Sequence, residues 1–311
     1  MSRIVIKRIV LTGPTGVLGL AITRYMVQIG VEVYAICRPN SKRIINIPKS
    51  PLIHIVECDM KNILNLSNYI DKSCDAFFHF AWAGTESAEN RFNMELQTEN
   101  IKNSLLAVRA AYSLSCKVFI GAGSQAEYGK TEGIISPSTP TNPDSGYGFA
   151  KLCTGQMTRV MCQQLGITHI WTRIISTYGI GDNPNTLISV IINDLLKGIK
   201  PSLTKCEQVW DYLYAGDAAH AFYRLAEDGH NGSIYVIGSG QTKTLREFAE
   251  IIRNEINPSL SLGFGERPYY KDQAMHLEAD ISTLFNDIGW KPETPFVEGI
   301  RKILMEINNH E

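Results

Sequence analysis

The chain has 311 residues, a formal net charge of −1 and 44% hydrophobic residues, an ordinary balance for a folded globular protein. Lys and Arg total 30 against 31 Asp and Glu, so no basic face is available for nucleic acid or an anionic membrane. No segment approaches the roughly 20 apolar residues of a membrane-spanning helix, and the N-terminal apolar run is too short for a signal peptide. We therefore expect a cytoplasmic protein that has neither nucleic acid nor membrane as a partner.

The seven cysteines are odd in number, show no C-x-x-C spacing and lie mostly in apolar runs. This pattern favours cysteine used as a small hydrophobic residue in a reducing compartment over disulfides or a metal site. We expect no bound metal, and we interpret Cys153 as a packing residue.

Short apolar strands alternate with helical patterns in the first half of the chain. Residues 4–11 form a β-branched run, residues 17–29 have helical periodicity that ends at Gly30, and residues 31–37 read as a second strand. This alternation predicts an α/β fold with a Rossmann-type, doubly wound parallel sheet. Further strands are expected at 53–58, 76–81, 116–120 and 168–175.

After residue 178 the pattern becomes more irregular and richer in loops. We expect a first domain over residues 1–178 with a returning segment near 207–238, and a smaller C-terminal α/β domain made of 179–206 and 239–311. Within this second half the sequence predicts helices at 187–197, 245–255 and 296–306, and strands at 209–214 and 233–237.

A glycine-rich turn follows the first expected strand and opens the first expected helix. Gly13 allows a tight turn, Gly16 lets backbone N–H groups approach a pyrophosphate, and Gly19 lets helix and strand pack closely. We therefore predict a nicotinamide dinucleotide on this loop, against Gly13, Thr15, Gly16, Val17 and Leu18.

The end of the second strand indicates which dinucleotide binds. An acidic residue there would bind the ribose 2′-hydroxyl, whereas an arginine accommodates a 2′-phosphate. The strand ends at Arg38, with no carboxylate nearby, which favours NADP and leaves NAD as the alternative. Asp59, after the third strand, is a candidate acceptor for the adenine amine.

Tyr147 and Lys151 are four residues apart and so share one face of a helix. A free phenol has a pKa of about 10, which is too high for proton exchange at neutral pH. We expect Lys151 and the positive nicotinamide ring to lower the pKa of Tyr147. Ser124, after the strand at 116–120, would share the hydrogen bond to a substrate oxygen. These three residues are the predicted catalytic group.

Several motifs together resemble the extended short-chain dehydrogenase/reductase superfamily, in its branch of NAD(P)-dependent sugar-nucleotide epimerases, dehydratases and reductases. The resemblance implies a sugar nucleotide in a cleft between the domains, with its C4 carbonyl or hydroxyl facing the nicotinamide. It rests on residues 12–19, 79–83 and 124–129, on Asn100, on Tyr147 with Lys151, and on Tyr178-Gly179 and 210–214.

The resemblance also implies a role for each matching residue. Tyr147 would be the general acid and base, Lys151 would bind the nicotinamide ribose and Ser124 would orient the substrate oxygen. Helices near 95–112 and 147–165 form a four-helix dimer interface in this family, so a homodimer is expected. The implied cofactor contacts include Met60, Phe80, Ala81, Trp82 and Asn100, and the implied substrate contacts include Gln125, Ser176, Leu187, Trp210 and Arg267.

The residues after Ser124 narrow the reaction. Dehydratases of the branch carry Asp-Glu where this chain has Gln125 and Ala126, neither of which can transfer a proton, and Glu127 is one position late and expected to point elsewhere. Reduction of a 4-keto sugar and epimerisation at C4 remain. Arg38 suggests NADPH as a consumed reductant, and residues 263–292 resemble abequose-synthase-like 4-ketoreductases that make deoxy sugars.

We therefore expect an NADPH-dependent reductase of a nucleotide-linked 4-keto-6-deoxy sugar, with an NAD-dependent 4-epimerase as the alternative. A non-catalytic NADP-sensing protein on the same fold is the third hypothesis. Two departures leave the substrate's nucleotide open among CDP, dTDP, UDP and GDP. Trp210 replaces an arginine that clamps the pyrophosphate, a charge that Arg267 or Lys205 would have to supply, and Ser176 replaces an asparagine.

Overall fold

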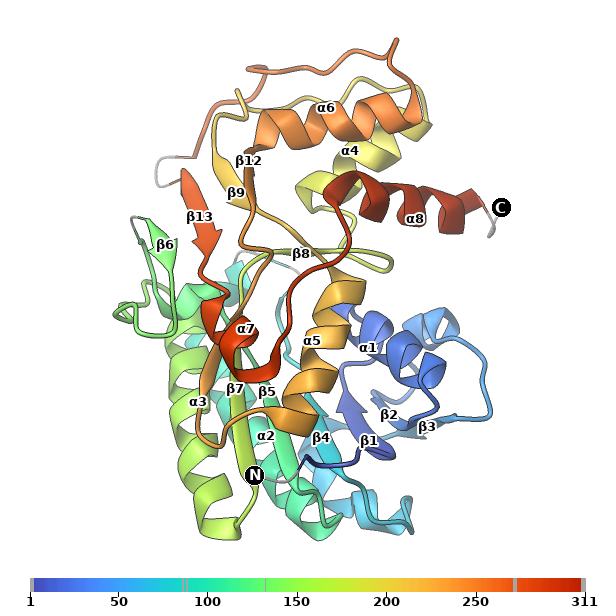
Figure 1. Ribbon diagram of the computed structural model, residues 1–311, viewed down its shortest axis with the longest axis vertical. Helices are drawn as coiled ribbons and strands as arrows, with labels where there is room; N and C mark the ends of the chain where they lie inside the picture. The colour runs from blue at the N-terminus through green and yellow to red at the C-terminus, as the bar shows by residue number, and fades with distance from the viewer. Residues whose placement is uncertain (1–2, 86, 88, 132, 271–272, 309–311) are drawn as a thin grey trace.

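The computed structural model describes residues 3–85, 87, 89–131, 133–270 and 273–308. Its centre is a seven-stranded sheet in the order β11-β7-β5-β4-β1-β2-β3, in which every neighbouring pair is parallel (Figure 1). The predicted Rossmann-type, doubly wound sheet is thereby confirmed. Its strands are β1 (Arg8–Thr12), β2 (Glu32–Cys37), β3 (Ile53–Glu57), β4 (Ala76–His79), β5 (Val118–Ser124), β7 (Thr168–Ile174) and β11 (Ile234–Ile237).

Helices cover both faces of this sheet because successive strand side chains point to opposite sides. Ile9 and Leu11 of β1 pack toward α1 (Val17–Gln28) and α5 (Ala215–Asp228). Val10 packs into the core on the other face. That face is covered by α2 (Met94–Ser113), α3 (Gly146–Leu165) and the 3-10 segment η2 (Met60–Asn68).

The central strand β5 differs from its predicted range of 116–120, because it begins at Val118 and runs to Ser124. Gly121 and Gly123 weaken the strand pattern in the sequence. In the fold, β7 pairs with β5 along its whole length, from Val118 to Ser124. Tertiary pairing therefore outweighs local propensity here.

The C-terminal part adds a helical layer at the top of Figure 1. Helices α4 (Leu187–Leu196), α6 (Leu245–Ile256) and α8 (Phe296–Asn308) share a separate hydrophobic core. Helix α7 (Ser282–Ile288) instead packs on the main sheet's core, through Leu284 and Ile288.

Small sheets lie between the helical layer and the main sheet. The predicted strand at 209–214 is two strands separated by Tyr212, because β9 pairs with β12 and β13 whereas β10 pairs with β8. The four-stranded sheet has the order β12-β9-β13-β6. The bounds are β6 (Ile134–Ile135), β8 (Thr177–Tyr178), β9 (Val209–Asp211), β10 (Leu213–Tyr214), β12 (Thr242–Thr244) and β13 (His276–Ala279).

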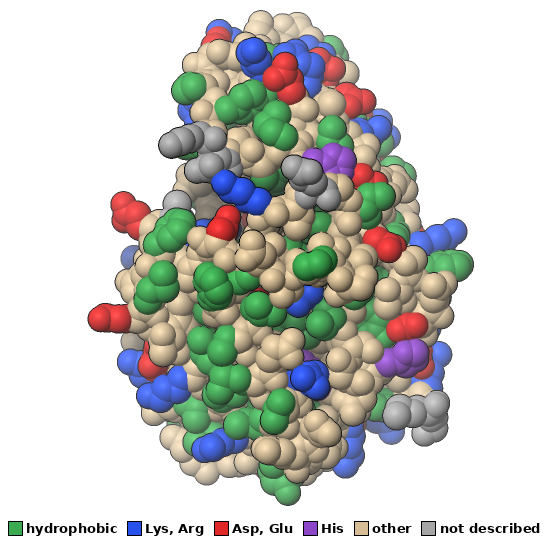
Figure 2. Space-filling view, turned by 90° about the vertical axis from the view of Figure 1, so that its left-hand side faces the viewer, with side chains coloured by type: hydrophobic (Ala, Val, Ile, Leu, Met, Phe, Trp, Pro, Cys, Tyr) green, Lys and Arg blue, Asp and Glu red, His purple; other side chains and the backbone are tan. Residues whose placement is uncertain are grey.

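Helix α3 presents apolar side chains outward. Phe149, Met157 and Val160 are 58%, 43% and 46% exposed, and Tyr112 at the end of α2 is 56% exposed. Figure 2 views this side of the molecule and shows hydrophobic side chains gathered on its lower half. Cys153 is exposed on α3, which corrects its interpretation as a packing residue: it lies one turn after Phe149, on the helix face turned away from the core.

No helix within the described ranges is both long and apolar enough to cross a membrane.

Asp211 joins the small four-stranded sheet to the end of the large one. Its Oδ1 accepts hydrogen bonds from the backbone N–H and hydroxyl of Ser239, both at 2.7 Å. Its Oδ2 accepts from the N–H groups of Gly240 at 2.9 Å and Ala279 at 3.2 Å. The side chain is fully buried, and Ser239 and Ala279 are buried with it, so their donors cannot bond to water instead.

We predict that Asp211→Ala lowers the free energy of unfolding by about 3 kcal/mol or more, because it leaves several buried donors unsatisfied. Urea unfolding followed by circular dichroism measures this as a lower midpoint. Asp71→Ala, at an exposed loop position, serves as the control and should shift the midpoint little. Equal shifts in the two variants would contradict the assigned role of Asp211.

Candidate active site

The phosphate loop lies where the strand order reverses, between β1 and β4. Gly13 has a φ of +74°, and a Cβ there would lie 2.8 Å from the backbone of Phe80. A Cβ on Gly19 would lie 2.1 Å from the Gly13 carbonyl oxygen. Both positions therefore require glycine, one for the turn and one for packing.

Gly16 differs from the other two glycines because the space beside it is open. The nearest atom to a Cβ built there is the Gly13 carbonyl oxygen, at 3.8 Å. Gly16 is also the N-cap of α1 and supplies no side-chain hydrogen bond, so first-turn N–H groups of the helix lack a side-chain cap. Free N–H groups beside an open backbone fit a pyrophosphate. Thr15, Val17 and Leu18 are partly exposed on the same loop.

A buried polar chain holds the ends of β1 and β4 together. The Thr12 hydroxyl accepts from the N–H groups of Phe80 and Ala81, both at 3.1 Å. It lies 3.0 Å from His79 Nδ1, and His79 Nε2 lies 2.9 Å from the Ser104 hydroxyl. Burial lowers the pKa of His79 to about 3, so the ring is neutral and links the strand ends as a structural element.

Asn100 and Gln97 on α2 fix the next part of the loop after β4. The Asn100 amide accepts from the Ala83 N–H and donates to the Ala83 carbonyl, both at 3.0 Å. Gln97 accepts a hydrogen bond of 2.9 Å from the indole of Trp82. Asn100 thus holds the loop after β4 in place. Gln97 does so too, but it was not identified from the sequence because it lies in none of the motifs.

Tyr147, Lys151 and Trp82 meet at the carboxyl edge of the sheet. The Trp82 and Tyr147 rings lie edge to face, with centroids 6.0 Å apart. The Lys151 ammonium lies 3.7 Å from the Trp82 ring centroid and donates a 2.6 Å hydrogen bond to the Ala122 carbonyl. Burial lowers the pKa of Lys151 to about 7. The structure therefore brings the predicted Tyr–Lys pair together. Trp82, in the loop after β4, contacts both side chains.

The electrostatics of Tyr147 differ from the expectation. Burial raises the pKa of its phenol, whereas hydrogen bonding with Ser124 and the charge of Arg91 oppose this rise. Lys151 is not among the groups that shift this pKa. Its ammonium donates to the Ala122 carbonyl and stands 5.7 Å from the Tyr147 ring centroid. Arg91 lies 5.1 Å from the same centroid and is exposed, and the sequence reasoning missed it.

Ser124 ends β5 and caps the short 3-10 segment η4 (Gln125–Glu127). Its hydroxyl oxygen accepts from the Ala126 N–H at 3.2 Å. The hydroxyl also hydrogen-bonds with the Tyr147 phenol. A substrate oxygen can take the place of that partner. Gln125 is partly exposed as the first residue of η4.

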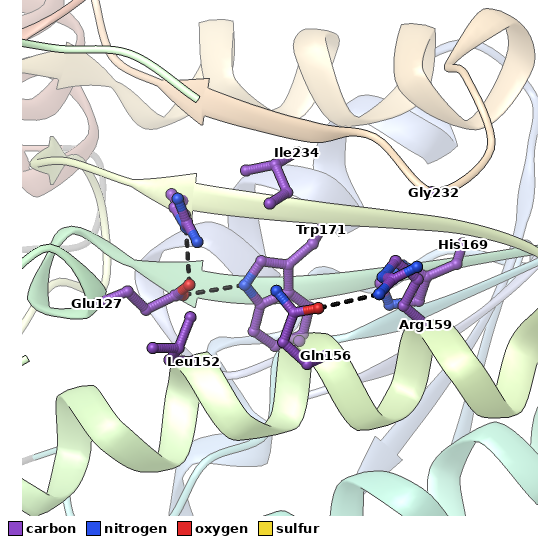
Figure 3. Close-up of a pocket in the computed structure, with 10 residues that line it drawn as sticks. Glu127, Leu152, Gln156, Arg159, His169, Trp171, Gly232 and Ile234 are labelled. Carbon is purple, nitrogen blue, oxygen red and sulfur yellow. Dashed lines mark hydrogen bonds and ion pairs between the residues drawn. The ribbon is translucent and has the colours of Figure 1, made fainter. Parts of the chain in front are cut away.

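Glu127 completes a capping box with Ser124, which is a visible S-x-x-E signal. Its Oε1 accepts from the Ser124 N–H at 2.9 Å. Figure 3 shows Glu127 directed at Trp171 of β7, above Leu152 of α3. As expected, Glu127 does not point toward the substrate side of the site. Its carboxylate turns inward, behind Ser124.

The proposed 2′-phosphate region is open and basic. Arg38 is exposed just past β2, and in the described part of the chain its side chain makes no hydrogen bond or ion pair. Arg43 lies in η1 (Lys42–Asn46) and donates to the carbonyls of Thr15 at 2.7 Å and Gly181 at 3.3 Å. Asp59 caps η2 by accepting from Lys61 N–H at 3.0 Å, and the partly exposed Met60 is the first residue of η2.

The predicted substrate residues are only partly brought together. The Trp210 indole donates a 2.9 Å hydrogen bond to the Ser176 hydroxyl, so these two unusual residues contact each other. Leu187 begins α4 and packs against the helical core. Arg267 is exposed, and across the described ranges its side chain makes no hydrogen bond or ion pair. Within the same ranges, no group of three or more His, Cys, Asp or Glu residues is placed to hold a metal ion.

Comparison with known proteins gives relatives that are named as reductases, epimerases and dehydratases of nucleotide-linked sugars. The chain is 28% identical over 215 residues to a dTDP-4-dehydro-6-deoxyglucose reductase of Escherichia coli, covering 67% of each chain. It is 23% identical over 305 residues to a CDP-abequose synthase of Salmonella muenchen, covering 96% of this chain and 97% of the relative.

Among solved structures, the fold matches a UDP-N-acetylglucosamine 4-epimerase from Methanobrevibacter ruminantium, solved with UDP-N-acetylmuramic acid. The TM-score is 0.87 at 21% identity, with full coverage of both chains. Residues 9–238 match the NAD dependent epimerase/dehydratase family. With its glycine loop and its Ser124, Tyr147 and Lys151 at one sheet edge, the chain belongs to the NAD dependent epimerase/dehydratase family.

Proposed function

We propose that this chain is a cytoplasmic, NADPH-dependent reductase of the C4 ketone of a nucleotide-linked 4-keto-6-deoxy sugar. The observation that carries the proposal is the composition of the site: Tyr147 and Ser124 can serve a carbonyl oxygen, but Gln125 and Ala126 follow where a dehydratase needs acidic groups. The proposed reaction belongs to the biosynthesis of deoxy sugars and surface polysaccharides.

The side chains supply the proton and hold the ketone. Burial keeps the Tyr147 phenol protonated at neutral pH, and this is the form that can protonate the oxygen of a ketone as it is reduced. The Ser124 hydroxyl donates to the same oxygen, in place of its hydrogen bond with Tyr147, and polarises the carbonyl. When bound, the reduced nicotinamide supplies the hydride to C4. Lys151 exchanges the Ala122 carbonyl for the ribose hydroxyls.

The cofactor assignment follows from the basic residues near β2. Gly13, Gly16 and the α1 N-terminus would hold the pyrophosphate, and Phe80, Ala81 and Asn100 would frame the path to the nicotinamide. Arg38 is free to pair with a 2′-phosphate, while Asp59 and Met60 would face the adenine. NAD is the alternative cofactor.

Two curated relatives support the reductase. One is named as a 4-dehydro-6-deoxy sugar reductase and the other as CDP-abequose synthase, and the second aligns over almost the whole chain. The matching solved structure is named as a 4-epimerase, so an NAD-dependent 4-epimerase is the second candidate. Ser176, Leu187, Trp210 and Arg267 would contact the sugar nucleotide on the C-terminal side.

We predict that the purified protein oxidises NADPH when given one of the CDP-, dTDP-, UDP- or GDP-linked 4-keto-6-deoxy sugars. Tyr147→Phe should lower kcat at least a hundredfold, because it removes the proton donor, while NADPH binding by calorimetry stays within threefold. NMR of the product assigns its C4 configuration. Interconversion of two sugar nucleotides without net NADPH loss, on retained NAD, would establish the epimerase instead. No turnover by the unaltered protein would leave the non-catalytic NADP sensor.

We further predict that Arg38→Asp weakens NADPH binding about tenfold or more and NADH binding much less, because only NADPH carries the 2′-phosphate. Lys197→Asp, an exposed change on the C-terminal helical layer, is the charge-matched control. Equal losses of NADPH and NADH affinity in Arg38→Asp would contradict the assignment of Arg38 to the 2′-phosphate.

We also propose a homodimer through the outward faces of α2 and α3. Phe149→Glu or Met157→Glu should then convert the dimer to a monomer in sedimentation velocity, because each places a charge in an apolar interface. Met305→Glu, at an exposed position of α8, should leave the dimer intact. A monomeric unaltered protein would rule the dimer out.

A further inference from the structure

A buried carboxylate stands directly behind the proposed catalytic serine. We propose that Glu127 is a positioning residue: anchored by Trp171 and Arg173 of β7, it fixes the backbone of Ser124 and places its carboxylate behind the site that holds Tyr147 and Lys151. This inference rests on the proposed roles of Ser124, Tyr147 and Lys151.

Three hydrogen bonds hold the Glu127 side chain in one position. The side chain is fully buried. Its Oε1 accepts from the Ser124 N–H and from the Trp171 indole, both at 2.9 Å. Its Oε2 accepts from Arg173 Nε at 2.7 Å. Figure 3 marks the bond between Glu127 and the Trp171 indole as a dashed line. A shift of β7 would therefore move Glu127 and, through it, Ser124.

Three glycines make room for this arrangement. A Cβ on Gly123 would lie 2.4 Å from Glu127 Oε1. Cβ atoms on Gly121 and Gly155 would lie 2.3 and 2.7 Å from the Trp171 ring. Strand β5 and helix α3 thus both carry glycines where a larger residue would collide with the Glu127 carboxylate or with the indole that donates to it.

Stability alone is a weak reason for this buried pair. Arg173 is 3% exposed, and its guanidinium lies 4.5 Å from the Tyr128 ring centroid. Removing two such charges from water carries a large desolvation penalty, and apolar residues of similar volume are often as stable or more so. The pair gives the site a rigid serine and a fixed charge, which apolar residues could not supply.

The charge of Glu127 acts on both titrating groups of the site. It raises the pKa of Tyr147 and of Lys151. Arg91 of η3 (Glu89–Phe92) opposes it at Tyr147, and His79 of β4 is neutral near Lys151. The carboxylate therefore favours the protonated phenol that a reductase needs. Removing the Glu127 charge should lower both pKa values. The loss of activity at alkaline pH should then begin at a lower pH.

The test is Glu127→Gln, which keeps an oxygen for the Ser124 N–H and removes the charge. We expect kcat for ketone reduction to fall about tenfold or more, with KM for both substrates within about threefold of its original value. The alkaline limb of the kcat profile should move to lower pH. NMR of ¹³C-labelled tyrosine, with the Tyr147 signal assigned from Tyr147→Phe, should show the phenol titrating at lower pH.

Glu227→Gln is the matched control, because Glu227 is also a buried carboxylate, paired with Arg3 and Tyr223 at the far end of α5. It should cost stability without changing the pH profile. If Glu127→Gln does not fold, Glu127→Gln with Arg173→Met removes the unpaired arginine and permits the same measurements.

Three results bear on the proposal in different ways. An unchanged alkaline limb and an unchanged Tyr147 titration in the folded Glu127 variant would overturn it, whatever the loss of kcat. The same pH shift in Glu227→Gln would also overturn it. If the unaltered protein reduces no sugar nucleotide, the proposed function fails, and the Tyr147 titration still decides whether Glu127 controls the phenol.

Discussion

The phosphate loop and the predicted catalytic group depend on the parallel pairing of β1, β4 and β5. Parallel strands end at the same edge, so Thr12, His79 and Ser124 are brought side by side although up to 112 positions separate them in the chain. The phosphate loop, the loop after β4 and the start of η4 each leave the sheet at this edge. The buried link from Thr12 through His79 to Ser104 keeps two of these strand ends aligned.

Most of the larger sheet could be predicted from the sequence because its strands are short apolar runs between helical patterns. The prediction failed where pairing overrides local preference. Gly121 and Gly123 read as a loop, yet they continue β5 because β7 lies beside them. Likewise the run at 209–214 looks continuous but divides at Tyr212 between two sheets. Neither pairing can be seen in a local window of sequence.

The parts of the site that lie in local sequence motifs were predictable. The glycine loop and the Tyr147–Lys151 spacing are local patterns, and the structure places both at the sheet edge. The direction of Glu127 was not predictable, because its donors Trp171 and Arg173 lie 44 and 46 positions away. The S-x-x-E spacing indicates a capping box but cannot show that the same carboxylate also takes an indole and a guanidinium.

The placement of Lys151 has a thermodynamic consequence for ligand binding. A buried lysine with a pKa of about 7 is only partly charged near neutral pH. In the proposed complex, an anionic dinucleotide beside Lys151 would favour the charged form, so binding above that pH would be accompanied by uptake of a fraction of a proton from solution. Affinity for the dinucleotide and the hydrogen-ion concentration are then linked. In that complex the free protein would bind the dinucleotide less tightly as the medium becomes alkaline, even before any chemistry at Tyr147 is considered.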